Sequence, residues 1–289
     1  MRSTLAAPDS PSILLLPVFF SHLDPTGIPT SEELAAILSS ADPSAGLLKV
    51  VAAMESLNGF GLLLKRNLVP AAAYPDYWPR LSRWIIFVDT YSEWLPSNHG
   101  LDTRRVVCLD TLMALFFNPE TKPLVLAAPG VRGVFARHWA ETVRNGQLHM
   151  GDNAGAVEPA TWEEMPPILR FLGSDLSGGH LEEILEAIHG DISDLAVLLV
   201  RQINVAVPRV LTDATASAIV SLKMIAALRD GDGPFNQTML ACGVIKSLLT
   251  ALVALAGANV TLSGRQFEQD IQMASGLLIE HFRAPLGYM

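Results

Sequence analysis

The sequence predicts an all-α protein, specifically a right-handed solenoid of stacked helices. Half of its 289 residues are hydrophobic, 17% are charged and the mean hydropathy is +0.33, so most segments must bury apolar side chains on more than one side. Leu and Ala, which favour helices over strands, are the main apolar types. Alternation of apolar and polar residues, the pattern of a half-buried strand, is absent.

Helix-start and helix-stop signals divide the first half of the chain into helices. Thr30 or Ser31 can cap a helix that opens with two glutamates, because a hydroxyl satisfies free amides and acidic side chains favour the positive helix end. Gly59 and Gly61 predict a break. The expected helical segments are residues 13–20, a helix opening at 31, 47–57, 62–68, 79–95, 104–117, 124–128 and 131–143.

The second half continues the same organisation after a predicted Gly-, Asn- and Asp-rich loop at residues 145–157. The turn glycines at 190 and 231 are 41 residues apart, near the ~40–47 residues of armadillo and HEAT repeats. The next turn glycine, Gly264, follows after 33 residues, so the period is irregular. The many short-linked helices that are apolar on more than one side lead us to expect one armadillo/HEAT-like array over residues 12–283, with a flexible N-terminus at 1–11 and a tail at 284–289. The expected helices are one that opens near 161, then 180–189, 192–207, 213–228, 235–258 and 267–282.

Charge and cysteine content restrict the function. The net charge is −9, from 20 Lys and Arg against 29 Asp and Glu, which argues against a nucleic-acid partner because phosphates require clustered cations. Cys108 and Cys242 lie too far apart in sequence for a disulfide framework or a zinc motif of their own. We expect an intracellular protein, cytoplasmic or nuclear, with no cofactor.

The stretch from Leu240 to Ala258 is about as long as a bilayer span of ~20 residues. It carries one charge, Lys246, and no basic cluster flanks it, so topology signals are missing. The favoured interpretation is a buried solenoid helix in which Leu249 and its neighbours pack against flanking helices, with no membrane contact. A membrane-associated helical protein is the alternative.

The densest aromatic region, residues 74–94, contains the candidate partner-binding side chains. Tryptophan, tyrosine and arginine dominate the binding energy of protein interfaces, whereas the competing interpretation is helix–helix core packing. The leading function is a protein–protein interaction scaffold. The candidate residues are Trp78, Arg80, Arg83, Tyr91 and Trp94.

A second functional hypothesis is a helical enzyme with its site between Arg137 and Asp152. His138, His149 and Asp152 are residue types that bind metals, but zinc needs three or four converging ligands and no motif spacing joins these three. No nucleophile elbow or phosphate-binding loop is present. The sequence therefore predicts no catalytic, cofactor-binding or metal-binding residue.

Two glycine-first runs, Gly243-Val244-Ile245-Lys246 and Pro129-Gly130-Val131-Arg132, resemble the opening of the last helix of an armadillo repeat, where glycine permits a tight turn. The second of these runs, together with residues 77–91 and His138-Trp139-Ala140, resembles uncharacterised proteins of mushroom-forming fungi. Many of those carry an armadillo-like region followed by a MYND zinc finger. No cysteine follows Cys242. The resemblance therefore implies either a relative without the finger or a chain that stops before it, and in both cases it supplies no zinc ligand.

Overall fold

The computed structural model describes residues 16–95, 101–148, 168, 171–173, 178–206, 234–244, 246–247 and 249–250. Throughout this part of the chain the secondary structure is helical, with turns between helices and no strand. The all-α prediction is confirmed. The predicted N-terminus at 1–11, the tail at 284–289 and the helices at 213–228 and 267–282 lie outside the described residues.

The chain divides into two compact units, Met1–Val134 and Phe135–Met289. The single array expected over residues 12–283 stays a prediction. The helices of the first unit are α1 (Leu16–His22), α2 (Ser31–Leu38), α3 (Pro43–Gly46), α4 (Leu48–Lys65), α5 (Tyr74–Thr90), α6 (Leu101–Phe117) and α7 (Lys122–Ala127), with 3₁₀ turns η2 (Pro25–Gly27) and η3 (Ala71–Ala73).

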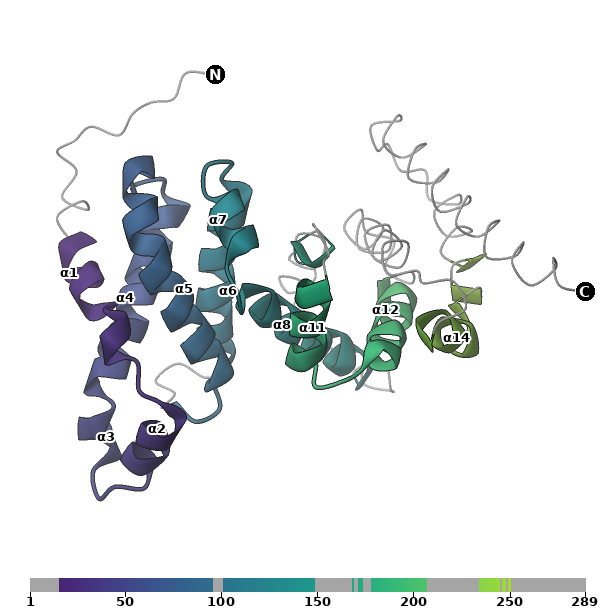
Figure 1. The fold of residues 1–289 in the computed structure, drawn as a ribbon, viewed down its shortest axis with the longest axis horizontal. Coiled ribbons are helices and arrows are strands. Elements are labelled where there is room, and N and C mark those ends of the chain that lie inside the picture. Colours follow the sequence, from purple (N-terminus) through teal and green to yellow (C-terminus); the bar gives the residue numbers. More distant parts are fainter. Residues whose placement is uncertain are drawn as a thin grey trace, which may run out of the picture. The chain divides into compact units, whose positions relative to one another are not determined.

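The helix α4 lies at the centre of the first unit and contacts α1, α5 and α6 (Figure 1). Burial on several faces of these helices gives the unit a continuous apolar core, because each helix covers its neighbours. Phe60, Ile85 and Leu112 are fully buried in it, and Trp84 is 1% exposed. The residues of α5 that belong to this core are buried, and the remaining residues of the helix stay at the surface.

The start of α2 confirms the predicted cap. The Thr30 Oγ1 atom accepts a hydrogen bond from the Glu33 amide at 3.2 Å, and the Glu33 carboxylate accepts one from the Thr30 amide at 2.8 Å. This reciprocal pair is a capping box, which satisfies two amide groups that the helix leaves free.

Gly130 and Gly243 confirm the predicted glycine turns. Their φ angles are +84° and +76°, in the left-handed region that costs other residues ~1–2 kcal/mol. The helix α8 (Val131–Leu148) follows Gly130 directly, and helical structure resumes at Val244. Each glycine thus lies in the turn that immediately precedes a helical segment.

The same turn at Gly243 corrects the predicted helix at 235–258. The helix α14 (Pro234–Ala241) ends before it, because a left-handed residue cannot continue a right-handed helix. Leu240 and Leu249 are each 49% exposed, so the prediction that Leu249 is buried is wrong. Residues 251–258 lie outside the described part.

The second unit contains the rest of α8 together with α11 (Gly178–Ala187), α12 (Ile192–Ala206) and α14. The predicted loop at 145–157 begins too early, since α8 continues through Leu148. The Arg144 guanidinium donates a hydrogen bond to the Ile188 carbonyl oxygen at 2.8 Å. The helices α12 and α14 pack directly on each other.

The break predicted at Gly59 and Gly61 is wrong, because α4 runs through both glycines. Their role is close packing. A Cβ atom built on Gly61 would lie 2.6 Å from Thr111 Oγ1 of α6, and one on Gly59 would lie 2.5 Å from Phe19 Cζ of α1. Both distances are below van der Waals contact, so only glycine lets the neighbouring elements approach this closely.

Replacing Gly61 with alanine is expected to lower the free energy of unfolding by about 1–3 kcal/mol through overpacking. The effect opposes the ~1 kcal/mol that alanine normally adds to a helix interior. Thr111 is 1% exposed and β-branched, so its side chain has little freedom to move aside. Urea unfolding followed by circular dichroism measures the change.

A matched control is Gly179→Ala in α11, where no atom lies within 4 Å of the added Cβ. Because Gly179 lies in the first turn of α11, this variant is expected to be neutral or to gain up to about 1 kcal/mol, the gain for a position in the middle of a helix. In a Thr111→Ala background, Gly61→Ala should lose most of its cost. A Gly61→Ala protein as stable as the wild type would contradict the close-packing interpretation.

Candidate functional site

The structure separates the five candidate partner-binding residues by their exposure along α5. Trp78 is 8% exposed and belongs to the core, because it lies on the side of α5 that also carries the buried residues Leu81 and Trp84. Arg80 and Tyr91 are half-buried, and Arg83 and Trp94 are exposed. The candidates therefore do not form one surface.

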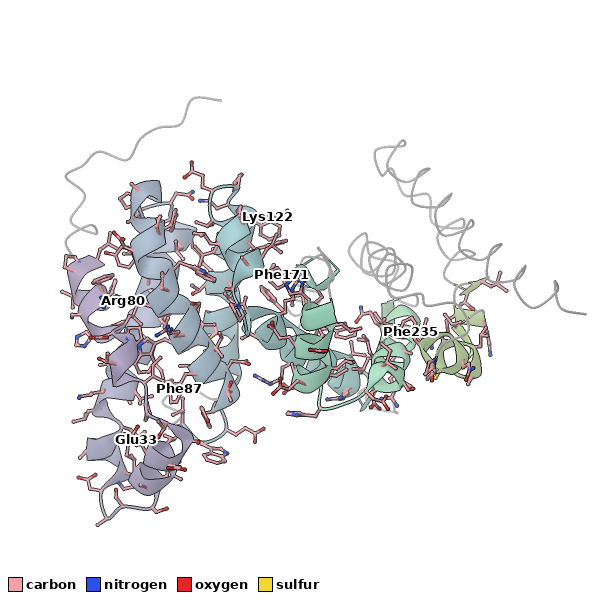
Figure 2. The ribbon with its side chains drawn as sticks, viewed as in Figure 1. Glu33, Arg80, Phe87, Lys122, Phe171 and Phe235 are labelled. Carbon is pink, nitrogen blue, oxygen red and sulfur yellow. The ribbon has the colours of Figure 1, made fainter. Side chains whose placement is uncertain are left out.

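Arg80 is engaged within the chain. Its guanidinium carbon lies 3.7 Å from the centre of the Phe20 ring, and its Nη1 atom donates a hydrogen bond to the Phe20 carbonyl oxygen at 3.3 Å. The Arg80 side chain is labelled in Figure 2. Phe20 belongs to α1, and its role was missed from sequence. The spacing of the apolar residues Leu16, Phe19, Phe20 and Leu23 is the signal that would have indicated it.

A continuous row of aromatic rings joins the core to the surface at the end of α5. The ring centres of Trp84 and Phe87 lie 5.6 Å apart, those of Phe87 and Tyr91 5.1 Å, and those of Tyr91 and Trp94 5.8 Å. Exposure rises from 1% at Trp84 to 52% at Trp94. The outermost indole is therefore supported by the core through two further rings.

Arg83 and Thr90 lie seven residues apart on α5, two helical turns, so they share one face. Both are exposed. Tyr91 and Trp94 occupy the turn that follows, in which the Tyr91 amide bonds to the Phe87 carbonyl and the Trp94 amide to the Tyr91 carbonyl. We call Arg83, Tyr91 and Trp94 the aromatic edge. It comprises an exposed arginine of α5 and, in the turn after the helix, two aromatic rings that pack on each other.

The residues of the enzyme hypothesis are only partly described. His138 is half-buried on α8, whereas His149 and Asp152 lie outside the described residues. Within the described part, no three His, Cys, Asp or Glu side chains gather to hold a metal ion. Burial, with a smaller contribution from the Asp89 carboxylate, strongly raises the pKa of the Cys108 thiol. This thiol therefore stays protonated and unreactive at neutral pH.

The membrane alternative was tested over the same residues. None of the described helices combines the length and the apolarity that a bilayer crossing requires.

No protein-family model, curated protein or solved structure matches the chain. The resemblance to armadillo-like proteins of mushroom-forming fungi therefore stays a prediction based on the residues that carry it.

Proposed function

We propose that the chain is a protein-interaction scaffold of the helical-solenoid type and that it binds a protein partner through the aromatic edge. The arrangement of the first unit supports a solenoid. The helices α4 and α6, which α5 separates in sequence, pack side by side (Figure 1), as equivalent helices of successive repeats do.

The observation that carries the binding proposal is the 52% exposure of Trp94 at the end of a row of packed rings. A large exposed indole held in place by neighbours loses little conformational freedom when a partner covers it. Arginine, tyrosine and tryptophan are also the residues most enriched among interface hot spots. The aromatic edge therefore has both the composition and the rigidity of a binding surface.

The proposal is tested with partner proteins that co-purify with the wild-type chain from its own cells. Each partner is then purified, and its affinity for the wild-type chain and for the variants is measured. We expect Trp94→Ala to weaken binding by about 2 kcal/mol or more, about 30-fold in affinity, with unchanged thermal unfolding. Leu48→Ala is the matched control, because Leu48 is 66% exposed on α4 and lies outside the aromatic edge. If both variants and the wild type bind the partner with equal affinity, the aromatic edge is not the binding surface.

A further inference from the structure

The seven-residue helix α1 has the pattern of a helical ligand. Its apolar side chains follow the spacing i, i+3, i+4, i+7, which is how an amphipathic helix inserts one face into a binding surface. The residues of this face are Leu16, 5% exposed, Phe19 and Phe20, both partly buried, and Leu23, fully buried, which directly follows α1. The residues between them, Pro17, Val18, Ser21 and His22, are exposed.

The helix α4 accepts Phe19 at a position without a side chain. The Phe19 Cζ atom lies 2.5 Å from where a Cβ atom of Gly59 would be. Any larger residue at position 59 would have to displace the Phe19 ring. Gly59 therefore provides the space that an aromatic side chain of a docked helix needs.

The helix α5 holds Phe20 with two side chains. Tyr77 meets the Phe20 ring edge-on, with ring centres 4.9 Å apart, and Tyr77 itself packs on Phe60 at 5.2 Å. The Arg80 guanidinium lies over the Phe20 ring and donates a hydrogen bond to the Phe20 carbonyl oxygen. That carbonyl is in the last turn of α1, where oxygens lack intrahelical donors. Arg80 thus recognises both an aromatic ring and the C-terminal end of a helix.

The chain that follows α1 is attached independently of it. The Trp84 indole donates a hydrogen bond to the Asp24 carbonyl oxygen at 3.3 Å, and the Asp24 carboxylate accepts one from the Thr26 amide at 3.0 Å. The Trp84 hydrogen bond joins this segment to α5, and the Asp24 carboxylate caps η2. The segment after α1 therefore has an attachment to α5 that does not depend on α1.

We propose that Gly59, Phe60, Tyr77 and Arg80, the α1-docking surface, form a helix-binding site that α1 occupies in cis. Its partner is a protein that presents a short amphipathic helix with Leu or Phe at i, i+3, i+4 and i+7. Helices shorter than ~12–15 residues are marginal alone, so the contacts with α4 and α5 hold α1 in its helical form. A partner helix with the same pattern would compete for those contacts and release α1. This surface is separate from the aromatic edge.

Fluorescence anisotropy of a labelled synthetic peptide with the sequence of residues 12–24 tests the proposal on the full chain. Two variants release α1: Phe20→Ala removes its central contact, and Ser21→Pro breaks the helix at an exposed position. We expect each variant to bind the peptide at least about tenfold more tightly than the wild type, because the cis helix no longer competes. Circular dichroism establishes that each variant is folded.

Controls locate the binding. A peptide with both phenylalanines replaced by alanine should not bind, and adding Gly59→Val or Arg80→Ala to the Ser21→Pro chain should abolish binding. Trp94→Ala should leave peptide binding unchanged, which separates this result from a test of the aromatic edge. Two outcomes would overturn the proposal. One is no peptide binding by either folded variant. The other is a wild-type dimer by light scattering that Ser21→Pro abolishes, because α1 would then be exchanged between two copies of the chain.

Discussion

Replacing Trp84 with alanine is expected to lower the free energy of unfolding by about 3–5 kcal/mol, the usual cost of truncating a buried aromatic residue. Trp84 is 1% exposed and packs edge-on against Phe87. Its indole also donates to the Asp24 carbonyl oxygen, and its Cζ2 atom lies 3.7 Å from a Cβ position on Gly27. The substitution therefore opens a cavity and releases η2. Urea unfolding followed by circular dichroism measures the loss.

Trp94→Ala is the matched comparison, ten residues further along the same row of rings. Because Trp94 is 52% exposed, its truncation should change stability by no more than about 0.5 kcal/mol. The two variants together separate folding from binding, since only Trp94→Ala should weaken the binding of a partner while leaving the fold intact. A similar loss of stability in both would show that the indole of Trp94 belongs to the core.

The aromatic run of residues 74–94 shows what sequence reasoning could and could not establish. Its helical period was readable, but the predicted bounds of 79–95 were wrong, because α5 runs from Tyr74 to Thr90 with Pro79 inside it. Which side of the helix is exposed could not be predicted from the sequence, because tryptophan is found in both cores and interfaces. Trp84 and Trp94 each pack against a ring three residues away, Phe87 and Tyr91, but only Trp84 also contacts a distant segment, through Asp24 and Gly27. Arg80 is the clearest case, since its contact with Phe20 joins residues 60 positions apart.

The glycines give a second contrast. The turn at Gly130 was predictable because this glycine immediately precedes an apolar run, and a left-handed residue is a local property of the chain. At Gly243 the same local signal was overruled by the predicted helix at 235–258, which was wrong. Gly59 and Gly61 were misread because local preference alone indicates a break. Their function depends on Phe19 and Thr111, which approach from other helices. Tertiary contacts therefore override the local preference at these two positions.

In the second unit, replacing Trp139 with alanine is expected to cost about 3–5 kcal/mol for the lost ring. A further cost comes from Gln202, whose Oε1 atom accepts the Trp139 indole hydrogen bond at 3.3 Å. Trp139 and Gln202 are both fully buried. The Gln202 Nε2 atom already lacks a hydrogen-bond partner in the structure, so the variant would leave the whole amide unsatisfied. A buried polar group in that state costs about 1–3 kcal/mol.

A double-mutant cycle separates the hydrogen bond from the packing. Trp139→Phe leaves the Gln202 amide without its donor, and Gln202→Met leaves the indole N–H without its acceptor, so each single change strands one buried group. The double variant strands neither, and replacing both partners of a buried hydrogen bond by apolar groups can be nearly neutral. We therefore expect the double variant to be more stable than the sum of the single losses predicts, by about 0.5–3 kcal/mol, the range found for residues in direct contact. Urea unfolding of the four proteins measures this coupling. Strictly additive losses would show that the hydrogen bond between α8 and α12 contributes nothing to the stability of the second unit.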